Sequence, residues 1–292
     1  MIVVLISGGL GNQLFEIVAG LSLQTRLRHA LIVDTRFMNE ARQPRRYVLP
    51  LLLGDFRSTS RVEHFLIRVA RWLAHRMRLV SFLRTNPLWS YVVDPDHEGA
   101  FSLLDDIRSK FIILEGYWQA LQPSEERIDL LRRSLRSIEK LSEAAQQLIR
   151  PLSSRTTLAV HIRRGDYVQD KLAFDFHGVC GKEYYDRAAR LVEERRTVRS
   201  IYVFSDDIEW ARENLQFELA TTYVSSQKSL TDVEEFLVMT HCHHFCISNS
   251  TYSWWAARLS SAPDKIVVAP ARWFSFSAAS AGPAMPSDWI RL

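Results

Sequence analysis

The stretch that decides the fold class is Thr157-Leu158-Ala159-Val160-His161-Ile162-Arg163-Arg164-Gly165-Asp166-Tyr167. Its first half is mainly apolar and predicts a buried strand, and polar residues crowd the strand's carboxyl end. In open α/β sheets, ligands bind at that edge. Planar guanidinium groups suit a phosphate, because they can hold it with two parallel hydrogen bonds. The segment therefore predicts an anion site; the alternative is a surface ion pair between Arg163 or Arg164 and Asp166.

Strands and helices alternate on both sides of this stretch. Residues 2–34 predict a strand, a helix and a second strand, which is a βαβ opening typical of a parallel sheet. The same alternation continues after residue 157. Pro151 lies just beyond a predicted helix and favours a boundary there, because proline cannot continue a helix. We therefore predict an α/β protein with domains over residues 1–151 and 152–292.

Composition and charge exclude several protein classes. The chain has 292 residues, an apolar fraction of 47% and a formal charge of +4, which is too weak to indicate nucleic acid. Three cysteines are too few for a disulfide framework and fit a reducing compartment. No apolar run approaches the roughly 18 residues that span a bilayer, and the N-terminus lacks the basic region of a signal peptide. We expect a cytoplasmic protein, either free or peripheral on the inner face of the membrane.

Two further polar segments follow predicted strands in the C-terminal half. Ser205-Asp206-Asp207 ends one strand, and Asn249-Ser250-Thr251 ends another. A parallel sheet would bring both segments to the edge where the arginines lie. Ser250 and Thr251 also open a helix, whose unpaired N–H groups and dipole favour a phosphate. Plain helix capping is the alternative for these two residues, and it is compatible with phosphate binding.

Two groups of side chains raise the question of a metal ion. Asp206 and Asp207 could hold Mg²⁺ together with substrate phosphates. Arg163, Arg164 and the helix N-terminus can neutralise a diphosphate without metal, so we expect no metal. One aspartate would then meet a nucleoside and the other would cap the helix at Ile208. The run His241–Cys246 has the composition of a zinc tract, but no second Cys/His pair has zinc spacing, so core packing is expected.

The first loop contains Gly8, Gly9 and Gly11 but departs from the dinucleotide fingerprint, because Leu14 stands where its last glycine belongs. This weakens the alternative of an NAD-dependent oxidoreductase. We expect the glycines to let the backbone approach a ligand. Asn12 and Gln13 then offer uncharged amides, which suit sugar hydroxyls better than phosphates.

Residues 61–84 predict a long helix with an unusual distribution of charge. Its basic stripe comprises Arg61, His64, Arg68, Arg71, His75 and Arg78, and its apolar residues lie on another face. One interpretation is an amphipathic helix with its charged side in water. The other is contact of residues 61–78 with an anionic lipid surface or a lipid-linked substrate, because the stripe has almost no acidic residues.

Four segments together resemble the α-1,2-fucosyltransferases of glycosyltransferase family 11. These segments are Gly8–Phe15, His161–Tyr167, Phe204–Asp207 and Ser248–Ala257. The resemblance covers essentially the whole chain. It implies a GT-B-like fold with two Rossmann-type domains facing a cleft. It also implies inverting transfer of L-fucose from GDP-L-fucose to the 2-hydroxyl of a galactoside, with no cofactor or metal. Transfer to another linkage and a non-catalytic lipid- or nucleic-acid-binding protein are the alternatives.

The resemblance also implies roles for individual residues of the C-terminal domain. Arg163 would hold the β-phosphate of GDP, with Arg164 beside it, and Asp166 would orient Arg163 or support its loop. His161 and Asp206 would lie at the nucleotide. Asn249, Ser250 and Thr251 would meet the phosphates.

On the acceptor side, the resemblance implies that the loop carrying Gly9, Gly11, Asn12 and Gln13 presents the galactoside. The family usually has a glutamine, an aromatic residue and an alanine after Phe15, where this chain has Glu16-Ile17-Val18. This departure affects the acceptor side alone. Glu16, Asp34 and Glu115 are the candidates for a general base, because ion pairing with arginine makes Asp166 a poor one.

Overall fold

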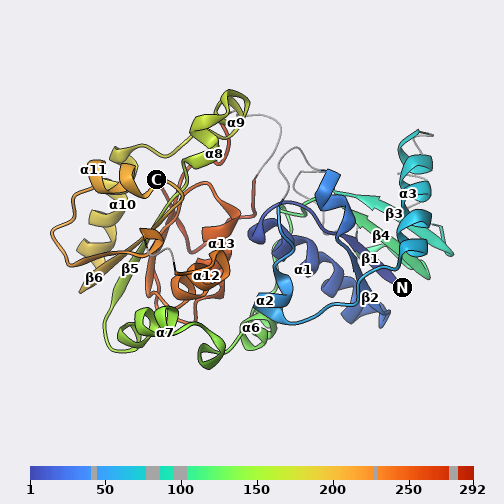
Figure 1. Ribbon diagram of the computed structural model, residues 1–292, viewed down its shortest axis with the longest axis horizontal. Helices are drawn as coiled ribbons and strands as arrows, with labels where there is room; N and C mark the ends of the chain where they lie inside the picture. Colours follow the sequence, from blue (N-terminus) through green and yellow to red (C-terminus); the bar gives the residue numbers. More distant parts are fainter. Residues whose placement is uncertain (41–44, 77–85, 95–103, 227–228, 276–281) are drawn as a thin grey trace. The chain divides into compact units, whose positions relative to one another are not determined.

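The computed structural model describes residues 1–40, 45–76, 86–94, 104–226, 229–275 and 282–292. These residues form two compact units, each built on one parallel sheet flanked by helices (Figure 1). The first unit runs from Met1 to Arg127, and the second begins at Ile128. Near the C-terminus, residues 282–284 belong to the first unit and residues 285–292 to the second. The predicted α/β class is confirmed.

The division between the units comes earlier than the sequence pattern predicted. The guanidinium of Arg132, in α6 (Glu125–Ser134), donates to the Leu259 carbonyl at 3.0 Å. The backbone N–H of Ser142, just before α7 (Glu143–Ile149), donates to the Glu234 carboxylate at 2.8 Å. The predicted boundary after residue 151 therefore lies inside the second unit, because the segment before it packs there.

The first unit has a four-stranded sheet in the order β2-β1-β4-β3. Its elements are β1 (Ile2–Leu5), α1 (Leu10–Leu27), β2 (Leu31–Asp34), α2 (Leu49–Leu53), α3 (Arg61–Arg76), β3 (Trp89–Val93) and β4 (Phe111–Glu115). Side chains of β1 alternate between two faces. Val3 and Leu5 pack with Ile67 of α3, whereas Val4 meets Gly20 of α1. Helices therefore cover both faces of this sheet, as expected for a parallel sheet.

The second unit has a six-stranded parallel sheet in the order β10-β9-β8-β5-β6-β7. Its strands are β5 (Thr157–Ile162), β6 (Ser200–Ser205), β7 (Thr221–Tyr223), β8 (His244–Cys246), β9 (Val267–Ala269) and β10 (Ile290–Arg291). Its helices after β5 are α8 (Gly165–Gln169), α9 (Lys171–His177), α10 (Lys182–Arg195), α11 (Ile208–Asn214), α12 (Asp232–Thr240) and α13 (Thr251–Leu259).

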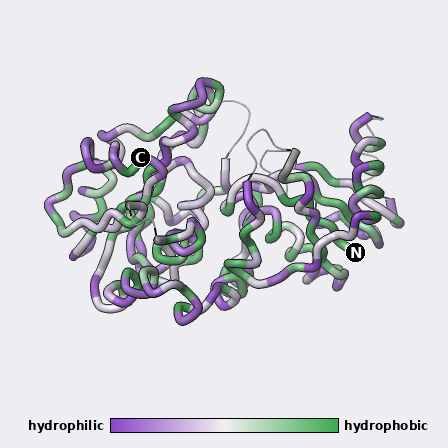
Figure 2. The backbone as a smooth tube through the Cα atoms, in the orientation of Figure 1, coloured by the Kyte–Doolittle hydropathy of each residue, from purple (hydrophilic) through white to green (hydrophobic). Residues whose placement is uncertain are grey.

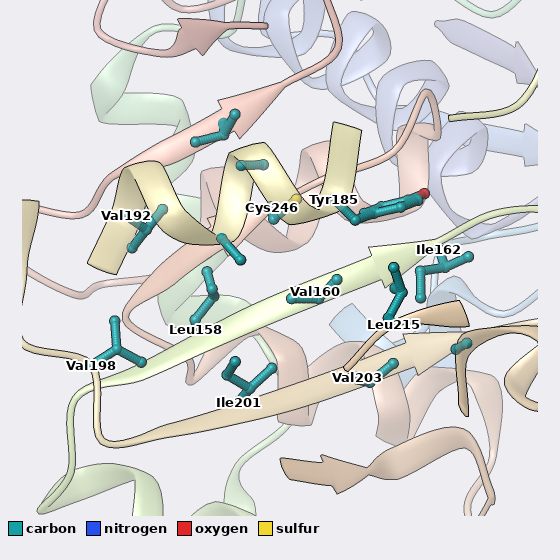
Figure 3. Close-up of a cluster of buried hydrophobic side chains, with 14 residues drawn as sticks. Leu158, Val160, Ile162, Tyr185, Val192, Val198, Ile201, Val203, Leu215 and Cys246 are labelled. Carbon is teal, nitrogen blue, oxygen red and sulfur yellow. The ribbon is translucent and has the colours of Figure 1, made fainter. Parts of the chain in front are cut away.

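The core of the second unit explains the orientation of β5. Leu158 and Val160 face α10, where they pack with Tyr185 and Val192 (Figure 3). Because successive strand residues point to opposite faces, His161 points away from α10. It lies among residues that follow β8. The alternation thus places a histidine beneath the loop that carries the arginines.

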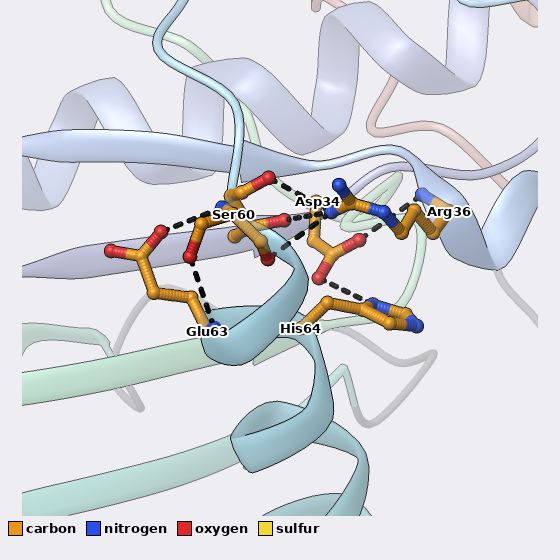
Figure 4. Close-up of polar contacts among 6 residues, drawn as sticks. Asp34, Arg36, Ser60, Glu63 and His64 are labelled. Atoms are coloured by element: carbon orange, nitrogen blue, oxygen red, sulfur yellow. Dashed lines mark hydrogen bonds and ion pairs between the residues drawn. The ribbon is translucent and has the colours of Figure 1, made fainter.

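Helix α3 is held against the ends of β2 and β4 by its basic side chains. His64 Nδ1 lies 2.8 Å from the Asp34 carboxylate at the end of β2 (Figure 4). Near the other end of the helix, Arg71 and His75 bind the Glu115 carboxylate at 2.8 and 2.7 Å. Part of the basic stripe, namely His64, Arg71 and His75, therefore has acidic partners, which come from strands distant in the sequence.

This arrangement corrects part of the expectation that the charged side of this helix faces water: Arg61 and Arg68 are exposed, whereas His64 and Arg71 are partly buried. Asp34 is fully buried and needs hydrogen-bonding partners, and His64 of α3 turns inward to meet it. The described part of α3 runs from Arg61 to Arg76, and the rest of the predicted helix, with Arg78, lies outside the described residues. Within the described ranges, no helix is long and apolar enough to cross a membrane.

Candidate active site

The carboxyl ends of β5, β6 and β8 lie at one edge of the second sheet. β5 lies between β6 and β8, and the register pairs Ile162 with Ser205 and Val160 with Cys246. All three strands are parallel, so the polar segments that follow them begin at the same edge. The sequence prediction that these segments share an edge is confirmed.

Arg163 bridges two carboxylates that come from different loops. Its Nη2 lies 2.5 Å from Asp166 Oδ1, and its Nη1 lies 2.6 Å from Asp206 Oδ2. The three side chains are 23%, 25% and 26% exposed. The ion pair with Asp166, which the sequence offered as an alternative to anion binding, is thus present. A guanidinium has five N–H donors, so two ion pairs fix its plane and use only part of its capacity.

Asp206 is engaged through both of its carboxylate oxygens. Oδ1 accepts a hydrogen bond from the backbone N–H of Arg164 at 2.8 Å, while Oδ2 binds Arg163. A Cβ atom at Gly165 would lie 2.8 Å from Oδ2, so any larger residue here would make the Asp206 carboxylate shift. The structure places Asp206 as a support for the arginine loop. Its contact with a nucleoside stays a prediction.

Arg164 and Asp207 lie against α11 rather than beside Arg163. The guanidinium of Arg164 stacks over the Trp210 ring at 4.1 Å, and its Nε lies 3.4 Å from Asp207 Oδ2. The other Asp207 oxygen accepts from the backbone N–H of Trp210 and caps α11. The predicted capping role of one aspartate is therefore confirmed for Asp207. The two adjacent arginines therefore contact different groups. Arg164 packs on α11, and Arg163 lies between the carboxylates of two loops.

His161 is an uncharged histidine beneath the loop. Its Nδ1 lies 2.8 Å from Ser248 Oγ, and its ring stacks on Tyr252 with centroids 5.5 Å apart. Burial, and secondarily the nearby Arg163 guanidinium, lower the pKa of His161 to about 3. At neutral pH it therefore links β5 to the segment after β8 through hydrogen bonding and stacking. Contact with a nucleotide is untested.

The segment after β8 leads directly into α13. Ser250 occupies the N-cap position and makes no side-chain capping bond, and Thr251 is the first helical residue. Asn249 is buried, and its amide donates to the carbonyls of His177 and Trp273 at 2.8 and 3.2 Å. Ser250 and Thr251 thus stand where a phosphate could meet the helix N-terminus. Asn249 instead ties three segments together.

Two aromatic residues near the arginine loop were not predicted. Tyr167 and His177 stack in parallel with ring centroids 4.3 Å apart, and the Arg163 guanidinium lies 5.1 Å from the Tyr167 centroid. Tyr167 was visible as the last residue of the opening stretch. His177 had no local signal, because its place depends on how α9 folds back over α8.

A half-buried carboxyl group near β6 was also missed. The Ser205 N–H donates to Ser225 Oγ at 2.9 Å, and that hydroxyl donates to Glu235 Oε2 at 2.6 Å. Burial raises the pKa of Glu235 above its usual value. In the sequence, Glu235 was indistinguishable from the solvent-facing acids that begin α12. This chain of bonds fixes the loop after β7 against the end of β6.

In the first unit, the glycine loop is shaped by its amide side chains. Gly8 has φ +67°, and a Cβ there would lie 2.7 Å from Asn12 Nδ2. Gln13 is fully buried and bonds the Gly8 and Arg46 carbonyls, so the structure places it inside the unit. Asn12 accepts from Gln119 at 3.1 Å. Gly9 caps α1 and Gly11 lies within that helix.

The three candidate general bases all have partners inside the first unit. Glu16 is fully buried and accepts from the Ser7 hydroxyl at 2.6 Å, and burial raises its pKa well above the usual value. Asp34 binds His64. Burial raises the pKa of Glu115, but bonds from Tyr91, His75 and Arg71 outweigh it and leave the pKa lowered. These contacts make each carboxyl group part of the fold.

The run His241–Cys246 packs mainly in the core, as expected, with His241 and His243 partly exposed. His243 Nδ1 meets the Thr157 hydroxyl at 3.1 Å, and His244 Nδ1 accepts from the backbone N–H of Ile266 at 3.1 Å. Cys242 and Cys246 are fully buried. Within the part of the chain that the structure describes, no group of three or more His, Cys, Asp or Glu side chains is placed to hold a metal ion.

Comparison with known proteins gives relatives along the whole chain. Residues 98–292 match the family model described as glycosyl transferase family 11. The O-antigen biosynthesis glycosyltransferase WbnK of Escherichia coli is 32% identical over 288 residues, covering 92% of this chain and 94% of that protein. An alpha-1,2-colitosyltransferase of E. coli is 26% identical over 300 residues, covering 100% and 99%. Human galactoside alpha-(1,2)-fucosyltransferase 1 is 29% identical over 167 residues, covering 53% and 45%.

Solved structures show the same fold at low sequence identity. The fucosyltransferase NodZ from Bradyrhizobium aligns with a TM-score of 0.54 at 14% identity, covering 91% of this chain and 94% of that one. This likeness confirms the GT-B-like fold that the sequence predicted.

Proposed function

The chain belongs to glycosyltransferase family 11, and on that premise we propose that it moves L-fucose from GDP-L-fucose to the 2-hydroxyl of a galactoside. It is a glycosyltransferase related to α-1,2-fucosyltransferases. The donor, the linkage and the galactoside acceptor are parts of the proposal. A role in building surface polysaccharide fits the relative named for O-antigen biosynthesis.

The observation that carries this proposal is the Arg163 guanidinium held between Asp166 and Asp206 at the edge where α13 begins. Two ion pairs orient the cation before any ligand arrives. A preorganised cation at a helix N-terminus suits a diphosphate leaving group, because no free energy is then spent on turning the side chain.

The proposed chemistry is an inverting displacement. The bond between the fucosyl anomeric carbon and the β-phosphate oxygen breaks, and its electron pair stays on the phosphate of the departing GDP. The acceptor oxygen attacks from the opposite face and loses its proton to a base or to water. Arg163 stabilises the charge that grows on the phosphate, and this interaction is stronger in the transition state than in the ground state.

The neighbouring residues receive supporting roles in this proposal. Asp166 positions Arg163, because its carboxylate is bound to that guanidinium. The backbone N–H groups that begin at Ser250 and Thr251 face the phosphates, with Arg164 and Asn249 holding the surrounding segments. His161 and Asp206 lie at the nucleotide end.

The acceptor belongs to the first unit in this proposal. Gly9, Gly11 and Asn12 border the acceptor, and Gln13 keeps their loop in shape from inside the unit. The acceptor glycan can be lipid-linked, with the enzyme at the cytoplasmic side of the membrane. No cofactor or metal is required, because Arg163 supplies the positive charge that a divalent cation would otherwise bring to a diphosphate.

A second donor is favoured by one relative. The α-1,2-colitosyltransferase matches the whole of this chain, so transfer of activated colitose through the same linkage is the alternative. This alternative has the same proposed phosphate site and differs only in the sugar that is transferred.

The decisive experiment is a screen of galactoside acceptors with GDP-fucose and with activated colitose, followed by linkage analysis of the product. We expect α-1,2-linked fucose. A product with another linkage, or turnover with colitose alone, would contradict the proposal. Activity should persist in EDTA; loss of activity that Mg²⁺ restores would refute the metal-free mechanism.

A further inference from the structure

Helix α3 presents an apolar face to solvent. Its exposed side chains recur at helical spacing, and they are Val62 (69% exposed), Phe65 (64%), Leu66 (60%), Val69 (40%) and Trp72 (61%). Ile67 and Ala74 lie on the opposite side and are buried against the sheet. The alternation of hydrophobic and hydrophilic residues along this helix is visible in Figure 2. A large apolar face exposed on one helix marks an interaction surface.

The outward direction of this face follows from the contacts on the inner side. His64 is bound to Asp34, and Arg71 and His75 are bound to Glu115. These partners lie at both ends of the helix, so they prevent it from rolling about its axis. The apolar face therefore cannot turn toward the sheet without removing the α3 partners of two carboxylates, which is costly.

Positive charge borders the apolar face. Arg61, Arg68 and Arg76 are exposed, whereas the single acidic residue of the helix, Glu63, is bound to Arg57 at 2.8 Å. A cavity of about 510 Å³ adjoins the face. It is lined by Phe37, Arg68, Arg71, Trp72, His75 and Arg76. The surface thus combines apolar side chains with an arginine-lined recess of suitable chemistry for a phosphate headgroup.

We propose that α3 binds the surface of an anionic lipid bilayer. Phe65, Leu66 and Trp72 enter the boundary between headgroups and acyl chains, and the bordering arginines bind lipid phosphates. Arginine stems lie along apolar surface while their charged ends stay at the headgroups, and tryptophan favours the same depth. Charge complementarity thus selects an anionic membrane as the partner. Binding of this kind would bring the enzyme to lipid-linked glycans.

Another exposed apolar segment in the chain shows why charge matters. Helix α9 exposes Leu172 (64%) and Phe174 (44%), which matches the exposure of the α3 side chains. Its one lysine, Lys171, is paired with Asp175 at 2.8 Å, and Asp170 caps the helix. This segment has no excess of positive charge. It provides a matched control for apolar exposure without the basic border.

The test is co-sedimentation of the full chain with vesicles of phosphatidylcholine alone or mixed with phosphatidylglycerol. We expect binding to the mixed vesicles, weakened by salt. Phe65→Ser with Leu66→Ser should lower the partition coefficient by about a hundredfold or more. Arg61→Gln and Arg76→Gln should each lower it by about fivefold. The control pair Leu172→Ser with Phe174→Ser should bind like wild type.

Several outcomes would overturn the proposal. One is equal binding of wild type to both kinds of vesicle, and another is equal loss in the α9 control. A third is a dimer in solution that the Phe65→Ser and Leu66→Ser changes abolish, without any vesicle binding. Circular dichroism checks that each variant is folded, and the salt titration of wild type needs no variant. Vesicle binding is measured without donor or acceptor, so it does not depend on the proposed transfer reaction.

Discussion

The two parallel sheets differ in the sign of the charged group that is held at the carboxyl edge by two or more partners. In the second unit, the strand-end loop contributes a cation, Arg163, and acidic loops hold it on two sides. In the first unit, the strand ends contribute the acids Asp34 and Glu115, and His64, Arg71 and His75 of α3 bind them. The same succession of strand and polar loop therefore builds two different electrostatic sites.

The difference lies in which charge still has bonding capacity. Asp34 has no exposed surface, and Glu115 is surrounded by three donors, so the first edge is satisfied internally. Arg163 is partly exposed, and a guanidinium has more donors than two carboxylates use. The comparison teaches that a charged sheet edge suits an anion when its central group is a cation, such as Arg163, and neighbouring carboxylates orient that cation.

The largest expected effect comes from removing that central cation. Arg163→Ala should lower kcat for fucosyl transfer by about 10²–10³, because a preorganised donor to the leaving phosphate is lost. Steady-state assays and GDP binding by calorimetry measure the change. Arg71→Ala is the matched variant on the other sheet edge, and it should leave GDP affinity intact. Wild-type turnover in the Arg163 variant, with the fold retained, would show that the phosphate is bound elsewhere.

The next effect tests how tightly the acids orient the cation. Gly165→Ala places a Cβ 2.8 Å from Asp206 Oδ2, so the carboxylate must move and Arg163 with it. Displacements of this size can cost on the order of 10² in kcat/KM. Gly181→Ala is the control, since its Cβ would meet the flexible end of Glu183. Equal kinetics for both variants would mean that the Asp206 contact does not position Arg163.

A smaller effect concerns the neutral histidine beneath Arg163. The pKa of His161 is lowered to about 3, so the unfolded chain binds this proton more readily and acid favours unfolding. Its contribution to the free energy of unfolding is complete above about pH 6.5 and is lost as the pH falls toward 3. The loss is on the order of 1 kcal/mol per pH unit.

Urea unfolding of wild type and His161→Asn between these pH values measures the slope. In the variant, the slope of the free energy of unfolding against pH should fall by the amount that corresponds to about one bound proton. Part of the slope should remain, because the pKa of His244 is also lowered, to about 4. Identical slopes in the two proteins would show that His161 is charged in the folded state. That result would remove the contrast between a neutral histidine in one unit and acid-paired histidines in the other.

The smallest effect is expected at a buried acid of the first unit. Burial raises the pKa of Glu16 well above its usual value, and its partner is Ser7. Glu16→Gln keeps an acceptor for Ser7, so we expect a stability change of about 1 kcal/mol or less and activity of the wild-type order. Fucosyl transfer and thermal unfolding measure both. A folded variant with severely reduced kcat would identify Glu16 as the general base.

Much of the second unit followed from the sequence because local signals agreed with the sheet. An apolar run followed by a polar segment located the ends of β5, β6 and β8, and parallel pairing brought those ends together. The capping role of Asp207 was predictable from its position before a helix. The bridge from Asp206 to Arg163 was not, because it depends on the side-chain directions of two loops.

The first unit was harder to predict, because periodicity shows that a helix has two faces without showing which one is buried. On α3, His64, Arg71 and His75 bind the sheet because Asp34 and Glu115 lie at strand ends distant in the sequence. Gln13 was expected beside the acceptor, but its amide fits the backbone of a neighbouring segment and is buried. In both cases the deciding partner is remote along the chain.

The buried amide of Asn249 has a consequence for local unfolding. It holds the end of α9 and the segment at Trp273 to the residue that precedes α13. Opening any one of these segments breaks bonds that anchor the others, so we expect them to exchange their backbone hydrogens as one cooperative unit. A ligand that orders the start of α13 therefore slows exchange in α9 as well. Because of the Asn249 side chain, hydrogen exchange in α9 would then indicate ligand binding even if α9 does not contact the ligand.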